Sequence, residues 1–211
     1  MRVFGRTIIL TVCALWGSVA QAQTPFTDPA AVLAEHFWSD LYAEGGQTFF
    51  CGTPFSSRGL GISEGYIYPL SFVRSALRCG SARQCERESE AYRRIASDLH
   101  NLVPVQSVIE LRRRNARYEL LGDGVPANEC GIREAGQTME PPDHVKGRIA
   151  RALAYMVTTY ELPMIMPGAL MRGWSEAFPP GDEERALNRR IIDIQGNGNP
   201  YIVTPSLMNN F

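Results

Sequence analysis

The stretch from Asp98 to Asn115 gathers the side chains that could do chemistry. It holds a histidine, carboxylates, amides and an arginine run within eighteen residues. Pro104 marks an extended first half, and the apolar spacing after it predicts a helix. A short strand, a loop and a helix that carry such side chains can hold a metal ion and a phosphate together. The alternative is a capped loop followed by a solvated basic helix face.

The N-terminus has the pattern of a secretory signal peptide. Arg2 and Arg6 flank the start of an apolar run, and Ala20-Gln21-Ala22 places small residues at the two positions that define a cleavage site. We expect cleavage after Ala22, which gives a signal peptide at 1–22 and a mature domain at 23–211, periplasmic or secreted. A short membrane anchor is the alternative for this run. No later segment reaches the ~20 apolar residues that a membrane span needs.

The mature chain keeps an even number of cysteines, which in an exported protein favours two disulfide bonds. Three pairings are possible, and the sequence does not separate them. The cysteines form no CxxC pair and have no nearby histidine, so a zinc site is not expected. They are Cys51, Cys79, Cys85 and Cys130.

The charge of the mature chain is not that of a general nucleic-acid-binding protein. Loss of Arg2 and Arg6 leaves 19 basic against 22 acidic residues, a net charge of about −3. Any site for a polyanion must therefore be local, and the arginines form two groups. The first group is Arg112, Arg113, Arg114 and Arg117; the second is Arg148, Arg151, Arg189 and Arg190.

The pattern of apolar residues predicts one mixed domain that is mostly helical. Asp28 and Pro29 begin the first expected helix, and His36 on its apolar stripe is expected to be a packed core residue. Short strands are expected at 48–52, 66–68 and 118–121. Further helices are expected at 70–77 and 87–99, from Pro142 to Tyr160, and at 166–178 and 183–194.

A series of motifs resembles the secreted bacterial endonuclease I family, which are periplasmic DNA/RNA nucleases of the ββα-metal (His-Me finger) class. Each motif is weak alone, but their order and spacing are specific. They are Leu41-Tyr42, Phe50-Cys51-Gly52, Asp98 to Pro104, Pro141-Pro142, Gly147 to Arg151, Tyr155-Met156, Trp174 and Gln195 to Tyr201. The resemblance implies an α+β domain around a small ββα-metal finger, a nucleic-acid partner, a monomer, and Mg²⁺ as cofactor if the protein is active.

In the family, a histidine takes a proton from the attacking water, and a glutamate beside it and a helix asparagine hold Mg²⁺. The Glu-His pair stands three residues before a proline, which is Pro69 here. The resemblance therefore places the pair on Gly65 and Tyr66. The helix asparagine falls on Glu110, which is a possible metal ligand.

Other family positions have candidates as well. Arg83 is the nearest candidate for the arginine that offsets charge in the transition state. Arg112, Arg113 and Asn115 are the expected substrate-binding residues. His100 could act as a substitute base, although the family carries a structural histidine in this segment as well.

Glu64 could replace the lost metal ligand only if its strand bulges, because a one-residue shift turns a side chain to the opposite face. Two hypotheses follow from these substitutions. The protein is a metal-dependent endonuclease with a substituted base, or it is a degenerate homologue that binds nucleic acid or a protein partner without cutting.

Overall fold

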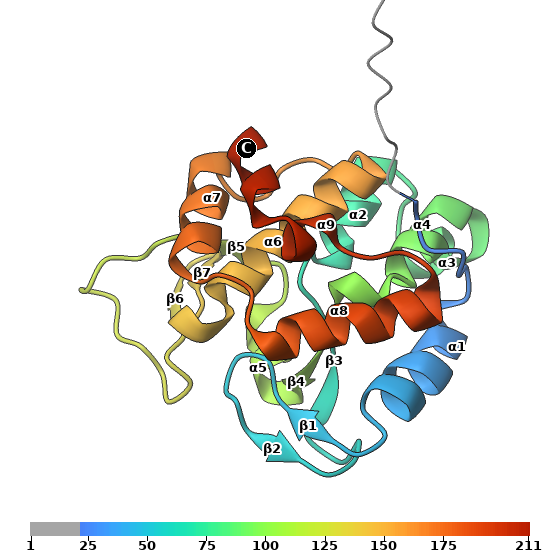
Figure 1. The fold of residues 1–211 in the computed structure, drawn as a ribbon, viewed down its shortest axis with the longest axis horizontal. Helices are drawn as coiled ribbons and strands as arrows, with labels where there is room; N and C mark the ends of the chain where they lie inside the picture. Colours follow the sequence, from blue (N-terminus) through green and yellow to red (C-terminus); the bar gives the residue numbers. More distant parts are fainter. Residues whose placement is uncertain (1–21) are drawn as a thin grey trace, which may run out of the picture.

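Helix α6 (Asp143–Tyr160) runs through the middle of the molecule, and the other elements pack around it (Figure 1). The structure is a computed structural model that describes residues 22–211. The predicted signal peptide therefore lies outside the described residues, apart from Ala22. No helix of residues 22–211 is long and apolar enough to cross a membrane.

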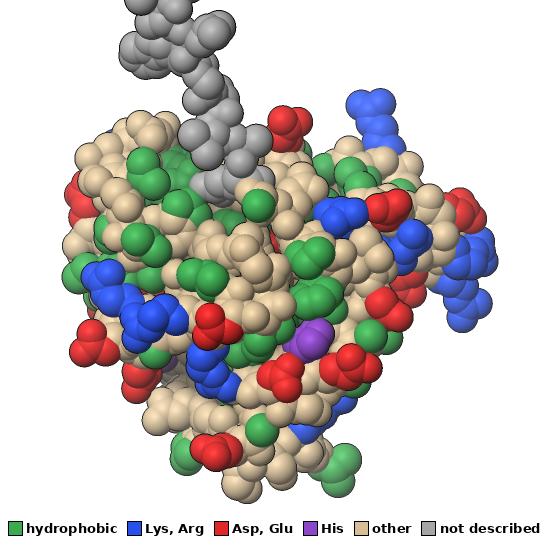
Figure 2. All heavy atoms as spheres, turned by 45° about the vertical axis from the view of Figure 1, so that its right-hand side comes forward, with side chains coloured by type: hydrophobic (Ala, Val, Ile, Leu, Met, Phe, Trp, Pro, Cys, Tyr) green, Lys and Arg blue, Asp and Glu red, His purple; other side chains and the backbone are tan. Residues whose placement is uncertain are grey.

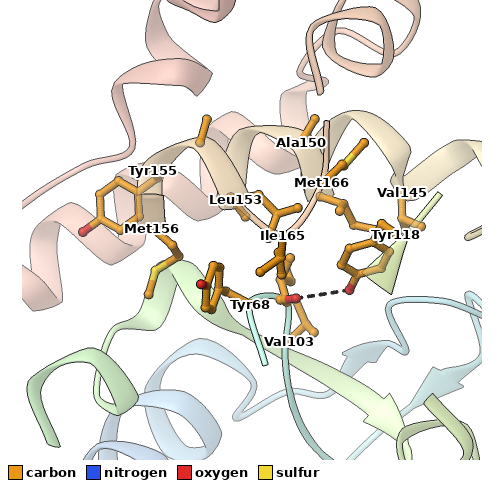
Figure 3. Close-up of a cluster of buried hydrophobic side chains, with 14 of the residues drawn as sticks. Tyr68, Val103, Tyr118, Val145, Ala150, Leu153, Tyr155, Met156, Ile165 and Met166 are labelled. Atoms are coloured by element: carbon orange, nitrogen blue, oxygen red, sulfur yellow. Dashed lines mark hydrogen bonds between the residues drawn. The ribbon is translucent and has the colours of Figure 1, made fainter. Parts of the chain in front are cut away.

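The core forms where the predicted apolar face of α6 meets the strands and loops below it. Side chains of Leu153 and Met156 point from α6 toward Tyr68 and Val103 (Figure 3). The Tyr118 hydroxyl is buried among them and donates to the carbonyl of Ile67 at 3.3 Å. Burial of this apolar surface is the main force that holds the helices to the strands.

A two-stranded sheet followed by a helix lies against this core. Strand β3 (Ile62–Tyr66) pairs antiparallel with β4 (Leu102–Gln106), and α5 (Ser107–Arg113) follows β4 directly. We call β3, β4 and α5 the finger. Its order is the ββα order that the resemblance implied, although β3 begins four residues before the strand predicted at 66–68. The prediction of an α+β fold is confirmed.

The N-terminal helix departs from its predicted packing. Asp28 caps α1 (Pro29–Ala31) as expected, but the chain continues as the π-helix η1 (Val32–Leu41). The prediction of a packed core His36 is wrong: its side chain is 28% exposed, and Nδ1 lies 2.8 Å from Asp40 Oδ2. A π-helix has i→i+5 hydrogen bonds, so α-helical spacing does not place the buried face correctly.

Two smaller sheets and a series of helices complete the domain. β1 and β2 form a hairpin. In the three-stranded sheet, β7 is the central strand and pairs parallel with β5 and antiparallel with β6. The strands are β1 (Gly46–Gln47), β2 (Pro54–Phe55), β5 (Arg117–Tyr118), β6 (Arg133–Ala135) and β7 (Thr138–Glu140). The helices are α2 (Leu70–Leu77), α3 (Ala82–Glu88), α4 (Glu90–Ala96), η2 (Leu99–Asn101), α7 (Gly168–Ala177), α8 (Asp182–Gln195), α9 (Pro200–Val203) and η3 (Pro205–Asn210).

Two of the predicted elements differ locally. The helix predicted at 87–99 is two helices, because Ser89 ends α3 and its hydroxyl caps α4 by accepting from Tyr92 N. The strand predicted at 48–52 is a turn, in which Gly52 takes a positive φ of 62°. Glycine adopts this conformation without steric cost.

Disulfides join Cys51 to Cys130 and Cys79 to Cys85. The prediction of two disulfides is confirmed, and the structure selects one of the three possible pairings. The first bond ties the turn after β1 to the loop before β6. The second closes the short turn between α2 and α3. Basic and acidic side chains are mixed over the face in Figure 2, in keeping with the nearly neutral net charge.

Candidate active site

The end of β3 carries the two positions where the family's Glu-His pair is expected. Gly65 is buried, and a Cβ built on it would lie 2.9 Å from Val105 Cγ1 and 3.0 Å from Glu110 Oε2. Such distances are shorter than ordinary van der Waals contact. The side chains of Val105 and Glu110 therefore occupy the space that a side chain at position 65 would need.

Glu110 is held in a two-pronged ion pair with Arg113. Arg113 Nε donates to Oε2 at 3.0 Å and Nη2 donates to Oε1 at 2.8 Å. Arg113 Nη2 also donates to the backbone carbonyl of Tyr66 at 2.7 Å. Burial alone would lower the pKa of Arg113, but Tyr118 and Glu110 outweigh that effect and raise it. The guanidinium is thus charged and is satisfied within the protein.

These residues do not fit a divalent metal ion. Both carboxylate oxygens of Glu110 already accept from Arg113, and Gly65 offers no ligand. Residues 22–211 contain no group of three His, Cys, Asp or Glu side chains placed to hold a metal. Mg²⁺ keeps several of its waters and is usually held by only one or two protein oxygens, so the site depends on positions 65 and 110, and neither has a carboxylate oxygen free of Arg113.

Glu64 does not replace the missing ligand. The pairing of β3 with β4 is unbroken from Ile62 opposite Gln106 to Tyr66 opposite Leu102, so the bulge that this substitution required is absent. Glu64 instead lies 3.4 Å from Arg58 in an ion pair.

Tyr66 is poorly suited to the role of a base. Its hydroxyl donates to the carbonyl of Ala96 at 3.3 Å. Burial first, and the charge of Glu64 second, raise the pKa of this phenol. A neutral phenol that already donates its proton elsewhere is a weak acceptor for a water proton. Tyr66 nevertheless borders a cleft of about 540 Å³, which Glu86 and Arg93 also line.

His100 lies in the core. Its Nε2 is 3.1 Å from the carbonyl oxygen of Asn197, and its ring meets the edge of Tyr155 with centroids 4.7 Å apart. Burial lowers the pKa of this imidazole. The contacts are those of a structural histidine, and its role as a base stays an untested prediction.

A buried polar network explains the motifs Asp98 to Pro104 and Gln195 to Tyr201. The Asp98 carboxylate accepts from the hydroxyls of Tyr155, at 2.8 Å, and Tyr160, and from Gln195 Nε2 at 3.1 Å. Gln195 Oε1 accepts in turn from the backbone of Leu99 at 2.8 Å. The network fixes the chain just before β4. The sequence did not connect either tyrosine with Asp98, because they lie 57 and 62 residues further along the chain.

The other expected site residues lie apart from this network. Arg83 is exposed on α3, Arg112 is exposed and pairs with Glu134 at 2.8 Å, and Asn115 is exposed after α5. Arg113 is only 2% exposed at its side chain. The structure thus leaves Arg112 and Asn115 accessible to a ligand and encloses Arg113.

The second arginine group meets at a groove of about 800 Å³. Arg148 and Arg151 come from α6 and Arg190 from α8, and the segment from Leu41 to Phe49 forms part of the lining. Arg189 is not part of the lining. Glu183 and His144 also border the groove, so its charge is mixed.

The three arginines of the groove differ in their partners. Arg151 is buried against Glu184, with Nη2 2.6 Å from Oε2. Arg148 stacks over the Phe49 ring at 5.1 Å, and Arg190 donates to the carbonyls of Asp40 and Leu41. Neither Arg148 nor Arg190 forms an ion pair with a carboxylate of residues 22–211.

The fold and site define an α+β protein built around a strand–strand–helix unit. The family model described as Endonuclease I matches residues 34–206. The chain therefore belongs to the endonuclease I family.

Curated relatives agree with this assignment. An endonuclease-1 of Buchnera aphidicola subsp. Acyrthosiphon pisum is 32% identical over 58% of this chain and 50% of its own length. An extracellular deoxyribonuclease of Aeromonas hydrophila is 31% identical over 65% of this chain and 63% of its own length. A periplasmic deoxyribonuclease of Aeromonas hydrophila is 30% identical over 70% of this chain and 65% of its own length. The chain thus spans between half and two thirds of these relatives.

Proposed function

We propose that this protein is an exported, nucleic-acid-binding member of the endonuclease I family whose finger has lost metal-dependent cutting. The observation that carries the proposal is the end of β3. Gly65 and a neutral Tyr66 stand where the resemblance requires a metal ligand and a base, and Arg113 occupies both oxygens of Glu110.

The expected loss of catalytic rate supports a protein that does not cut. A positioned general base contributes roughly 10²–10⁴-fold to the rate of such a reaction. A bound cation would neutralise charge on the scissile phosphate, which is a separate and comparably large contribution. Loss of both leaves no group in the finger that activates water.

Nucleic acid remains the best-supported ligand. Relatives named endonuclease-1 and deoxyribonuclease support a phosphodiester partner, and the groove between α6 and α8 offers a place for one. Arg148 and Arg190 present guanidinium groups without ion-paired carboxylates there. Arginine is well suited to phosphate recognition because its planar fork of donors matches phosphate oxygens.

Two measurements on the mature protein test this proposal. Supercoiled plasmid incubated with Mg²⁺ should stay supercoiled, as it does with EDTA. A labelled oligonucleotide should bind at low salt, with an affinity that falls as salt rises. Mg²⁺-dependent nicking would refute the loss of cutting, and absence of binding at low salt would refute the nucleic-acid partner and favour a protein partner.

Cutting with a substituted base is the second candidate function. The cleft of about 540 Å³ beside Tyr66 favours it, because the position of the family's base still opens to a ligand-sized space. This candidate predicts nicking that Tyr66→Phe abolishes. Nicking that Tyr66→Phe leaves unchanged would exclude Tyr66 as its base.

A further inference from the structure

The Glu110–Arg113 ion pair bridges the strand and helix parts of the finger. Arg113 belongs to α5, and its Nη2 donates both to Glu110 Oε1 at 2.8 Å and to the Tyr66 carbonyl of β3 at 2.7 Å. Its Nη1 lies 3.4 Å from the Tyr118 hydroxyl. We propose that the Arg113 guanidinium is the permanent cation of this finger and makes a divalent metal ion unnecessary for its structure.

Gly65 is the second part of this arrangement. Its φ is outside the left-handed range, so its backbone does not require glycine. What requires glycine is space, since a Cβ would lie 3.0 Å from Glu110 Oε2 and 2.9 Å from Val105 Cγ1. Gly65 and Glu110 are therefore a matched pair: the carboxylate that neutralises Arg113 reaches the space that glycine leaves open.

This pairing has a consequence for any attempt to rebuild a metal site. Glutamate introduced at position 65 alone would bring a second carboxylate against the one on Glu110. Like charges at this separation repel, and no room exists for the added side chain. A glutamate at 65 is tolerated only if position 110 gives up its carboxylate and the Val105 side chain shifts.

The first test is the melting temperature of the mature protein in EDTA and with millimolar Mg²⁺ or Mn²⁺. If Arg113 is the cation of the finger, the melting temperature should be the same within about 1 °C in all three solutions, because a ligand stabilises only a state that binds it. A saturable rise of several degrees with either metal would overturn the proposal. This test does not depend on nucleic-acid binding, so it fails separately from the proposed function.

The second test removes the internal cation. Arg113→Gln should lower the melting temperature by roughly 10 °C, because it leaves a partly buried carboxylate without its partner. Arg112→Gln is the matched control on the same helix, and its exposed ion pair should change the melting temperature by about 2 °C or less. Equal effects of the two variants would contradict the proposal. If Arg113→Gln does not fold, Arg113→Lys should fold with a smaller loss, since it keeps the charge but not the fork.

The third test measures the coupling between positions 65 and 110. Gly65→Glu and Glu110→Asn should each lower the melting temperature. The fall in the double variant should be smaller than the sum of the two single falls. Calorimetric titration with Mg²⁺ should give heat of binding for the double variant and none for the natural protein. Additive losses would show that the two positions are not a matched pair.

Discussion

Asp98 shows how one buried side chain organises residues far apart in the sequence. Its carboxylate accepts from Tyr155, Tyr160 and Gln195, and from the backbone N–H of His100 at 2.9 Å. Burial first, and the charge of Asp98 second, raise the pKa of both tyrosines, so both remain donors. A buried anion with several donors is stabilising as a unit. Loss of its carboxylate removes the acceptor of both tyrosine hydroxyls and of the His100 N–H, whereas Gln195 Nε2 still donates to Asn197 Oδ1.

We therefore expect Asp98→Ala to lower the free energy of unfolding by about 3–5 kcal/mol, the range for a broken buried charged network. Denaturant unfolding followed by circular dichroism measures this loss. Asp193→Ala, at an exposed position of α8, is the control and should change the free energy by about 0.5 kcal/mol or less. Similar losses in the two variants would show that the network does not stabilise the fold.

His100 gives a prediction about pH. Burial lowers its pKa in the folded state, so the unfolded chain, with a pKa of about 6.5, takes up the proton first as pH falls. The contribution of His100 to stability is complete above that pH. It is lost as pH falls from about 6.5 toward the lower folded-state pKa, by at most about 1.4 kcal/mol per pH unit.

His100→Gln should therefore flatten the fall in stability between about pH 6.5 and 5, measured by denaturant unfolding at each pH. The exposed His144 provides the comparison, since His144→Gln should retain the slope of the natural protein. An unchanged slope in His100→Gln would mean that a group other than His100 is responsible for the fall in stability.

Among the elements, the two disulfides close loops of very different length. Cys51 and Cys130 are 79 residues apart, whereas Cys79 and Cys85 are 6 apart. Chain-entropy arguments give about 4.5 kcal/mol for the long loop and about 2.4 kcal/mol for the short one. We expect the paired Ser variant of Cys51 and Cys130 to lose more stability to denaturant than that of Cys79 and Cys85. The reverse order would indicate that native-state contacts, not loop entropy, dominate.

The sequence predicted helices α2 and α6 best, at 70–77 and from Pro142 to Tyr160. For the finger, it predicted the order of the elements but placed the first strand four residues too late. What the sequence could not supply was the Glu110–Arg113 contact. Spacing of three along a helix permits that ion pair, but the same sequence also permits Glu110 to act as a metal ligand. The open space beside Gly65 favours the ion pair, and this space is evident only when β3 and α5 are placed together. The π-helix was missed because its apolar pattern also fits an α-helix.

At the scale of the whole molecule, the groove depends on the packing of helices far apart in the sequence. The sequence grouped Arg148, Arg151, Arg189 and Arg190 as a local cluster. The structure places three of them at one groove, pairs Arg151 with Glu184, and leaves Arg189 outside the lining. Which arginines remain free for a ligand follows from tertiary contacts, which the sequence pattern does not encode.

The groove leads to a prediction for nucleic-acid binding. Arg148→Ala and Arg190→Ala should each weaken binding of a labelled oligonucleotide and reduce the slope of log affinity against log salt by about one. Fluorescence anisotropy at several salt concentrations measures both quantities. Arg189→Ala, one residue from Arg190 on α8, is the matched control. If Arg189→Ala weakens binding as strongly as the other two variants, the ligand does not bind in the groove.

A nicking assay shows whether this family member has lost metal-dependent cutting because Arg113, and not a metal ion, pairs with Glu110. Supercoiled plasmid would be incubated with the mature protein and with a Gly65→Glu, Tyr66→His, Glu110→Asn triple variant, each in Mg²⁺ and in EDTA. We expect only the triple variant to nick the plasmid, and only in Mg²⁺. Nicking by the natural protein in Mg²⁺ but not in EDTA would contradict this expectation.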